Sequence, residues 1–154
     1  MLYEKIRHVK SPIRKTIGSG GIDFFIPNDW EHTSYNLMPQ KGIVIPSGIK
    51  PIVQTGTILT AFNKSGVSTK RLIIKTAEMI DSDFRGEMHI AVVNVGAEPI
   101  TIARGDQLVQ FAELPVLINP VQEITSDTYT YLQQPTDRDT SGLSSDVANK
   151  HNYQ

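Results

Sequence analysis

Short apolar segments separated by turn residues recur along most of this chain, and they restrict the fold more than any other feature. Glycine, proline, asparagine and aspartate interrupt them at spacings of about 8–12 residues, which is typical of an all-β sandwich or barrel. No window shows a long amphipathic helical stripe, and the best helical candidate is a turn or two over residues 65–71. The expected strands are residues 42–48 (running into a turn), 52–54, 57–62, 72–74, 89–95, 100–102 and 107–111.

The composition changes near Val121, and residues 126–154 are rich in Thr, Ser, Asp, Asn and Gln. Such a segment has few apolar side chains to bury and is not expected to order itself alone. We therefore expect a β domain over residues 1–125 and a polar, flexible C-terminal arm over residues 126–154. The arm is either a frayed terminus or a segment that closes over a ligand or a neighbouring subunit. Arg138, followed by several hydroxyl side chains, would suit binding of a phosphate.

Composition excludes several classes of function. The 154 residues include no cysteine, so thiol nucleophiles, thiolate metal sites and disulfides are ruled out. The formal net charge of −1 argues against broad electrostatic binding of nucleic acid or of an anionic membrane. No apolar run approaches the roughly 20 residues of a membrane span, and the N-terminus lacks the apolar core of a signal peptide. We expect a soluble cytoplasmic protein, acting in the host cytoplasm if it is viral.

The chemically most informative stretch is residues 79–86, which read Met-Ile-Asp-Ser-Asp-Phe-Arg-Gly. Asp81 follows an apolar pair, so we expect it at the end of a buried strand, where a desolvated carboxylate can act as a general base. Phe84 offers a flat apolar face, and Gly86 allows a turn or a close approach to a ligand. Considered alone, the stretch is better explained as an ordinary polar turn between two strands.

Four motifs in order resemble those of the trimeric dUTPase family, in the dUTPase/dCTP deaminase superfamily. They are Gly20-Gly21-Ile22-Asp23-Phe24, then Lys64-Ser65-Gly66-Val67, then Ile80-Asp81-Ser82-Asp83-Phe84-Arg85-Gly86, and finally Gly105-Asp106-Gln107-Leu108-Val109-Gln110. Each motif is weak alone. Together, at compatible spacing over about 110 residues, they form a specific signal.

The resemblance implies a β jelly-roll homotrimer with sites at subunit interfaces. It also implies hydrolysis of dUTP to dUMP and pyrophosphate, with Mg²⁺ held mainly by the triphosphate and water. Asp81 would activate the attacking water, and Phe84 would pack on the deoxyribose and exclude a 2′-hydroxyl. The other residues assigned to substrate binding are Lys64, Ser65, Gly66, Ile80, Gln110 and Arg138. Asp23 matches a family position whose side chain either contacts metal-bound water or stabilises a turn.

Departures from the family pattern bear on phosphate and base binding. Lys64 and Gln107 stand where arginine is usual, and Phe84 stands where tyrosine is usual. Lysine keeps the charge of arginine but loses its bidentate fork. The fifth motif is the most altered, because residues 138–147 keep Arg138 and Gly142 but lack most of the family's glycines.

Three alternatives to dUTP hydrolysis make different demands on the sequence. A dCTP deaminase-like enzyme would carry a glutamate on the strand after the third motif, whereas that strand reads Ala91-Val92-Val93. A dCTP pyrophosphatase would keep the same chemistry with another base. A catalytically weak relative that binds or regulates a partner would explain the altered arm, but it would leave Asp81, Ser65 and Gln110 without a purpose.

Overall fold

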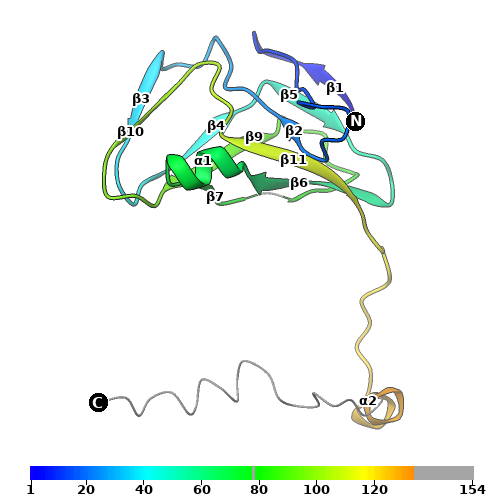
Figure 1. Cartoon of the computed structure of the whole chain (residues 1–154). Coiled ribbons are helices and arrows are strands. Elements are labelled where there is room, and N and C mark those ends of the chain that lie inside the picture. The colour runs from blue at the N-terminus through cyan, green and yellow to red at the C-terminus, as the bar shows by residue number, and fades with distance from the viewer. Residues whose placement is uncertain (78, 134–154) are drawn as a thin grey trace, which may run out of the picture. The chain divides into compact units, whose positions relative to one another are not determined.

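The computed structural model describes residues 1–77 and 79–133, and over these residues the chain is mostly β (Figure 1). Two compact units are present, Met1–Ile118 and Asn119–Gln154. Every described strand belongs to the first unit. The elements are β1 (Leu2–Lys5), β2 (Ile22–Asp23), β3 (Ser34–Leu37), β4 (Gly42–Pro46), β5 (Ile49–Ile52), β6 (Thr57–Asn63), α1 (Ser65–Lys70), β7 (Ile73–Lys75), β8 (Met79–Ile80), β9 (His89–Asn94), β10 (Ile100–Ala103), β11 (Val109–Pro115) and α2 (Ser126–Leu132).

The strands pair in four small antiparallel sheets. Their orders are β2-β11-β6-β8, β4-β9-β7, β1-β5 and β10-β3. The longest pairing joins β6 to β11 over seven positions, from Val109 opposite Asn63 to Pro115 opposite Thr57. Many of the pairs join strands that are far apart in the sequence, as sandwich architectures require, so the expected all-β class is confirmed.

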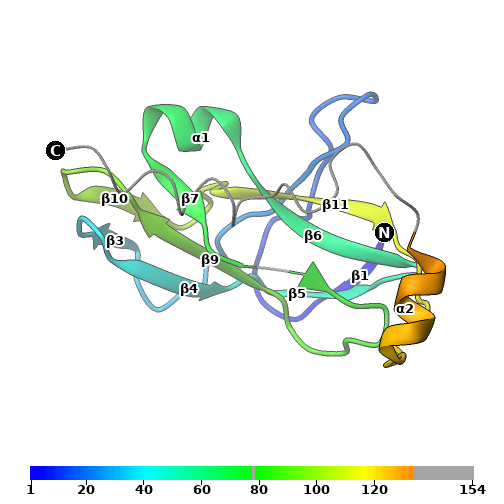
Figure 2. The same ribbon diagram turned by 90° about the horizontal axis from the view of Figure 1, so that it is seen from below.

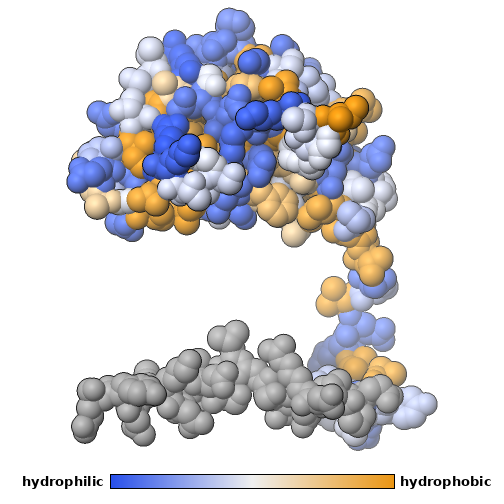
Figure 3. All heavy atoms as spheres, viewed as in Figure 1, coloured by the Kyte–Doolittle hydropathy of each residue, from blue (hydrophilic) through white to orange (hydrophobic). Residues whose placement is uncertain are grey.

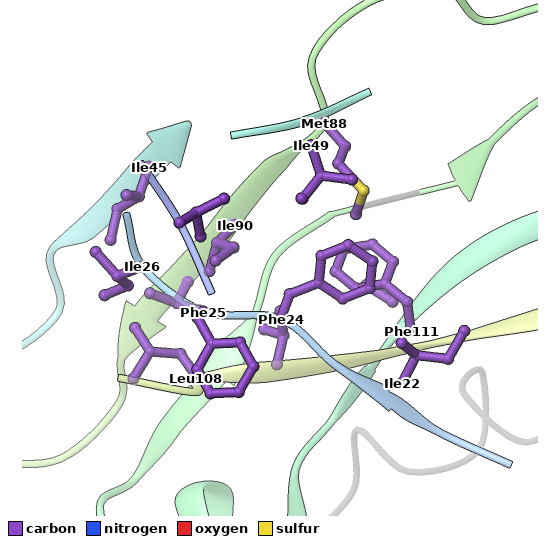
Figure 4. Close-up of a cluster of buried hydrophobic side chains, with 14 of the residues drawn as sticks. Ile22, Phe24, Phe25, Ile26, Ile45, Ile49, Met88, Ile90, Leu108 and Phe111 are labelled. Carbon is purple, nitrogen blue, oxygen red and sulfur yellow. The ribbon is translucent and has the colours of Figure 1, made fainter. Parts of the chain in front are cut away.

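Alternation along β6 and β11 explains how these strands form a core. Leu59 and Ala61 are buried on β6, and Val109 and Phe111 are buried on β11, while the residues between them are more exposed. Side chains at every second position share one face of a strand, so these apolar positions face the same interior. The core also includes Phe24, whose ring meets that of Phe111 edge-on at 4.9 Å between centroids (Figure 4).

The sequence pattern located most strands correctly but missed the short ones. Strands β1, β2 and β3 were not predicted, the strand expected before Asp81 is the two-residue β8, and β5 lies at Ile49–Ile52 rather than at residues 52–54. Strand β5 contains Pro51. It is accommodated because β5 belongs to a two-stranded pair in which Pro51 lies opposite Tyr3, and proline is tolerated on sheet edges. The short helix predicted over residues 65–71 is confirmed as α1.

The described part of the second unit contains helix α2, which composition did not predict. Its N-cap is Thr125, whose side chain accepts a hydrogen bond from the Thr128 amide over 3.3 Å, and Asp127 lies in its first turn. These local interactions suffice for one short helix, although none of its residues is buried. Across residues 1–77 and 79–133, no helix is long and apolar enough to cross a membrane.

A salt bridge ties the N-terminal segment to the loop that follows the third motif. The Arg7 guanidinium donates to both Glu87 carboxylate oxygens, over 2.7 and 3.3 Å, and the Gly48 amide donates to Glu87 over 2.7 Å. Burial alone would raise the pKa of Glu87. The hydrogen bonds from Arg7 and Gly48, with the charges of Arg7 and His89, outweigh that effect and leave the pKa of Glu87 below its usual value.

Replacing Glu87 by glutamine should therefore make the free energy of unfolding change less with pH in the acidic range. A carboxyl whose pKa is depressed by folding adds stability above its unfolded pKa, near 4.5, and that stability is lost as the pH falls through the lower folded pKa. We expect Glu87→Gln to cost about 1 kcal/mol at pH 7, allowing for the solvent around Arg7, and progressively less as the pH falls below about 4.5. Urea unfolding at pH 7 and pH 4 measures this difference. The exposed Glu4→Gln is the control, and an equal loss at both pH values would contradict the assignment.

Candidate active site

The catalytic candidate Asp81 lies directly after strand β8, at the start of a tight turn. The Phe84 amide donates to the Asp81 carbonyl oxygen over 3.2 Å, and the Arg85 guanidinium donates to the Ser82 and Phe84 carbonyl oxygens over 2.9 and 2.8 Å. These bonds fix the backbone of the turn. The Asp81 side chain is exposed, so the expected desolvation is wrong for the single chain. A neighbouring surface would have to cover Asp81 to exclude water.

The two apolar residues before Asp81 have different environments. Ile80 is only 5% exposed and belongs to the hydrophobic core, whereas Met79 is 63% exposed. The alternation follows from the pairing of β8 with β6, which turns Ile80 inward beside Leu59. Any contact between Ile80 and a nucleotide would therefore be made by its backbone rather than by its side chain.

Phe84 folds back over Gly86, and the close approach explains the glycine. A Cβ atom at position 86 would lie 2.7 Å from Cζ of the Phe84 ring. The ring is 37% exposed and lines a pocket of about 410 Å³, together with Met79, Ile80, Gly86, Glu87, Met88 and His89. Gly86 thus allows the Phe84 ring to approach the backbone closely, while Phe84 stays partly exposed.

Gly86→Ala should displace the Phe84 ring without unfolding the protein, because the clash falls on the far end of a mobile side chain. If the ring excludes a 2′-hydroxyl, the preference for dUTP over UTP should fall by about tenfold, the effect of one methyl group in a tight pocket. Steady-state kinetics on both nucleotides measures the preference. Gly18→Ala is the control, because a Cβ atom there meets nothing within 4 Å. An unchanged preference in Gly86→Ala would remove Phe84 from sugar selection.

A second pocket, of about 340 Å³, brings together side chains from the first, second and fourth motifs. It is lined by Lys15, Ser19, Gly21, Asp23, Lys64, Ser65, Gly66 and Gln110. Strand register explains the gathering, because Gln110 on β11 lies opposite Asp23 on β2 and opposite Phe62 on β6. Helix α1 begins just after β6 and adds Ser65. Three segments far apart in the sequence thus contribute hydroxyl, amide and ammonium groups to one cavity.

Inside this pocket, Lys64 is held by two partners. Its ammonium group forms an ion pair with Asp23, which is only 6% exposed, and it donates to the Gln107 side-chain oxygen over 2.8 Å. Asp23 is therefore the partner of a cation, a role that the motif comparison did not predict. The sequence held one sign of this contact, because Lys64 and Gln107 both depart from the arginine that is usual in the family. The structure shows that these two side chains are hydrogen-bonded to each other.

Gln110 is fixed beside Gly21 and the end of β6. Its side-chain amide donates to the Asn63 carbonyl oxygen over 3.1 Å. A Cβ atom at position 21 would lie 2.9 Å from Cδ of Gln110, so any side chain there would push the amide away. The Asn63 side chain in turn accepts a hydrogen bond from the Lys75 amide over 2.8 Å. Gly21 and Asn63 therefore position the amide that the resemblance assigned to phosphate binding.

Within one chain, Asp81 and the Lys64 pocket lie at opposite ends of β6. Ile80 pairs with Leu59, so Asp81 lies beside Ile58, and both line a shallow pocket of about 310 Å³. Lys64 follows Asn63 at the other end of the strand. Six residues of extended chain span about 20 Å, too far for one nucleotide phosphate to contact both side chains. Arg138 lies outside the described residues.

Comparison with known proteins identifies the family. The dUTPase family model matches residues 7–146. The deoxyuridine 5′-triphosphate nucleotidohydrolase of Wolbachia pipientis subsp. Culex pipiens (strain wPip) is 32% identical over 126 residues, which cover 79% of this chain and 77% of the relative. The chain belongs to the dUTPase family. The enzyme of the same name from Bartonella bacilliformis is 32% identical over 145 residues, 87% of this chain and 80% of that protein.

Solved structures show that the fold is shared with phage dUTPases. A variant of the Staphylococcus bacteriophage 80alpha dUTPase with dUpNHpp superposes with a TM-score of 0.77, over 94% of this chain and 96% of that one, at 17% identity. The dUTPase of phage phi11 of S. aureus gives a TM-score of 0.70 at 19% identity, over 80% and 94% of the two chains. At these identities the likeness concerns the fold, and the family membership rests on the sequence matches.

Proposed function

We propose that this member of the dUTPase family hydrolyses dUTP to dUMP and pyrophosphate, with Asp81 as the general base. The observation that carries the assignment is the turn after β8, which presents an exposed Asp81 carboxylate three residues before a Phe84 ring that packs closely against Gly86. The Asp81 carboxylate would take a proton from water as the water oxygen bonds to the α-phosphorus. The bond from that phosphorus to the bridging oxygen breaks, and pyrophosphate leaves.

The Lys64 pocket is proposed to bind the phosphates. Ser65 and Gly66 are exposed at the start of α1, Gln110 is fixed by Asn63, and Lys64 supplies an ammonium group. Hydrogen-bond donors around a polyphosphate stabilise the negative charge that accumulates during phosphoryl transfer. Because Lys64 is paired with Asp23, it would have to share its three N–H donors between the carboxylate and a phosphate oxygen. Arg138 is proposed as the cation that holds the γ-phosphate.

A homotrimer would solve the separation of the two parts of the site. One chain would supply Asp81 and Phe84, and another would supply the Lys64 pocket, with the arm covering the nucleotide. Apolar side chains on strands are available for such contacts: Phe62 is 43% exposed, and Met79 and Val44 are 63% and 64% exposed. Figure 3 shows several apolar patches, separated by hydrophilic surface, along the lower rim of the first unit. Light scattering should give three times the 17.1 kDa chain mass, and a fully active monomer would exclude a shared site.

Magnesium fits the proposed chemistry as an ion carried by the triphosphate. Mg²⁺ prefers oxygen ligands and keeps several waters. The only carboxylate that lines the phosphate pocket, among the described residues, is Asp23, and its charge is balanced by Lys64. Asp23 therefore suits contact with metal-bound water better than direct coordination. When bound, the ion would draw negative charge from the phosphate oxygens.

We expect the enzyme to act in the cytoplasm, where deoxynucleotides are found.

Pyrophosphate release from dUTP, dCTP, dTTP and UTP tests the proposed function. Release from dUTP well above the other three nucleotides supports it. Preferred release from dCTP would assign a dCTP pyrophosphatase instead. No release from any nucleotide, by a correctly assembled protein with Mg²⁺, would leave a binding or regulatory role.

A further inference from the structure

The phosphate pocket contains a second cation, Lys15, which belongs to none of the four motifs. Lys15 lines the cavity together with Lys64, Ser65 and Gln110. It precedes β2 by seven residues, in the loop that runs from Arg14 to Gly20. Figure 2 shows this loop and helix α1 projecting from the same side of the first unit. The loop therefore brings a lysine to the cavity that the family motifs build from β2, β11 and α1.

Charge pairing distinguishes Lys15 from the other cations nearby. Lys64 is neutralised by Asp23. Arg14 donates to the carbonyl oxygens of Ser19 and Gly20 over 2.9 and 2.6 Å and lies 3.9 Å from Glu113. Lys15 is exposed, and over residues 1–77 and 79–133 its ammonium group has no ion-pair or hydrogen-bond partner. The uncompensated positive charge of this pocket is therefore that of Lys15.

The loop around Lys15 is held in place, although the lysine side chain is not. The Thr16 amide donates to the Ser19 hydroxyl over 3.1 Å, and the Ser19 amide donates to the Thr16 carbonyl oxygen over 3.1 Å. Together with the two Arg14 bonds, these contacts fix the backbone on which Lys15 stands. A long side chain on a fixed backbone can reach an anion in the cavity at little ordering cost to the loop.

We propose that Lys15 is a further substrate-binding residue, which attracts the polyphosphate chain of the nucleotide into the Lys64 pocket. The proposal rests on the function proposed above. An ammonium group acts as a hydrated point charge, and its attraction grows with the negative charge of the ligand. Lys15 thus binds a triphosphate more strongly than a monophosphate. It supplies an unpaired positive charge, whereas the charge of Lys64 is paired with Asp23.

Three variants test this assignment: Lys15→Gln removes the charge, Lys15→Arg keeps it, and Lys41→Gln is the control. Lys41 is an exposed lysine between β3 and β4 that lines none of the pockets described above. Lys15→Gln should raise the KM for dUTP about two- to fivefold with little change in kcat, the pattern of an interaction equal in ground and transition states. Lys15→Arg and Lys41→Gln should resemble the parent.

Calorimetry with inorganic tripolyphosphate and with dUMP separates this proposal from the function itself. Lys15→Gln should weaken tripolyphosphate binding by the same two- to fivefold, about the effect of one exposed charge pair, and should leave dUMP binding almost unchanged. Tripolyphosphate binding equal to that of the parent would overturn the role of Lys15, whether or not dUTP is hydrolysed. A parent that releases no pyrophosphate from dUTP would overturn the proposed function, while the tripolyphosphate comparison would still decide on Lys15.

Discussion

Asp81→Asn is expected to lower kcat for dUTP by about 10²–10⁴-fold while leaving nucleotide binding nearly intact, because general-base catalysis contributes that much. The amide oxygen of asparagine can orient water but cannot accept its proton. The loss should therefore fall on the chemical step rather than on affinity. Pre-steady-state pyrophosphate release, with binding of a slowly hydrolysed analogue measured alongside, separates the two effects.

Asp83→Asn is the matched control for this prediction. Asp83 is exposed on the same turn as Asp81 and lines the same shallow pocket, so it carries an equal charge in nearly the same place. If the contribution of Asp81 were only a local negative charge, both variants would lose activity to a similar extent. A kcat within about threefold of the parent in Asp81→Asn would show that Asp81 is not the base.

Removal of residues 126–154 is expected to lower kcat for dUTP by about a hundredfold or more, the usual effect of losing a cation or donor that stabilises transition-state charge. The first unit, Met1–Ile118, contains every described strand and the whole core cluster, so the truncated protein should still fold. Circular dichroism and light scattering would check folding and assembly, and steady-state kinetics would measure kcat and KM.

Arg138→Ala should reproduce most of the loss caused by the truncation, since Asp139 and Asp146 in the same segment would repel phosphate. A contact made mainly in the transition state lowers kcat and kcat/KM together, whereas a contact made throughout binding raises KM alone. Lys150→Ala, which removes an equal charge outside the motif, is the control. Unchanged kinetics in both the truncation and Arg138→Ala would exclude the arm from catalysis.

Local sequence patterns were sufficient to predict the β class and most of the strands, because alternation and turn residues act over a few neighbours. Strands β2 and β8 have two residues each, too few for alternation to register, and they exist only because β11 and β6 pair with them. Strand β3 likewise depends on its pairing with β10, in which Tyr35 lies opposite Ile102.

By itself, the sequence determined which residues are candidates for the chemistry: Asp81, Phe84, Lys64, Ser65 and Gln110 stand in ordered motifs whose residue types suit phosphoryl transfer. Only the tertiary structure decided where these residues lie relative to one another. The antiparallel register of β6 with β8 and β11 places Asp81 at one end of β6 and the phosphate pocket at the other. The same folding pairs Lys64 with Asp23 and brings Lys15 into the pocket, because contacts between distant segments depend on strand register, which short motifs do not encode.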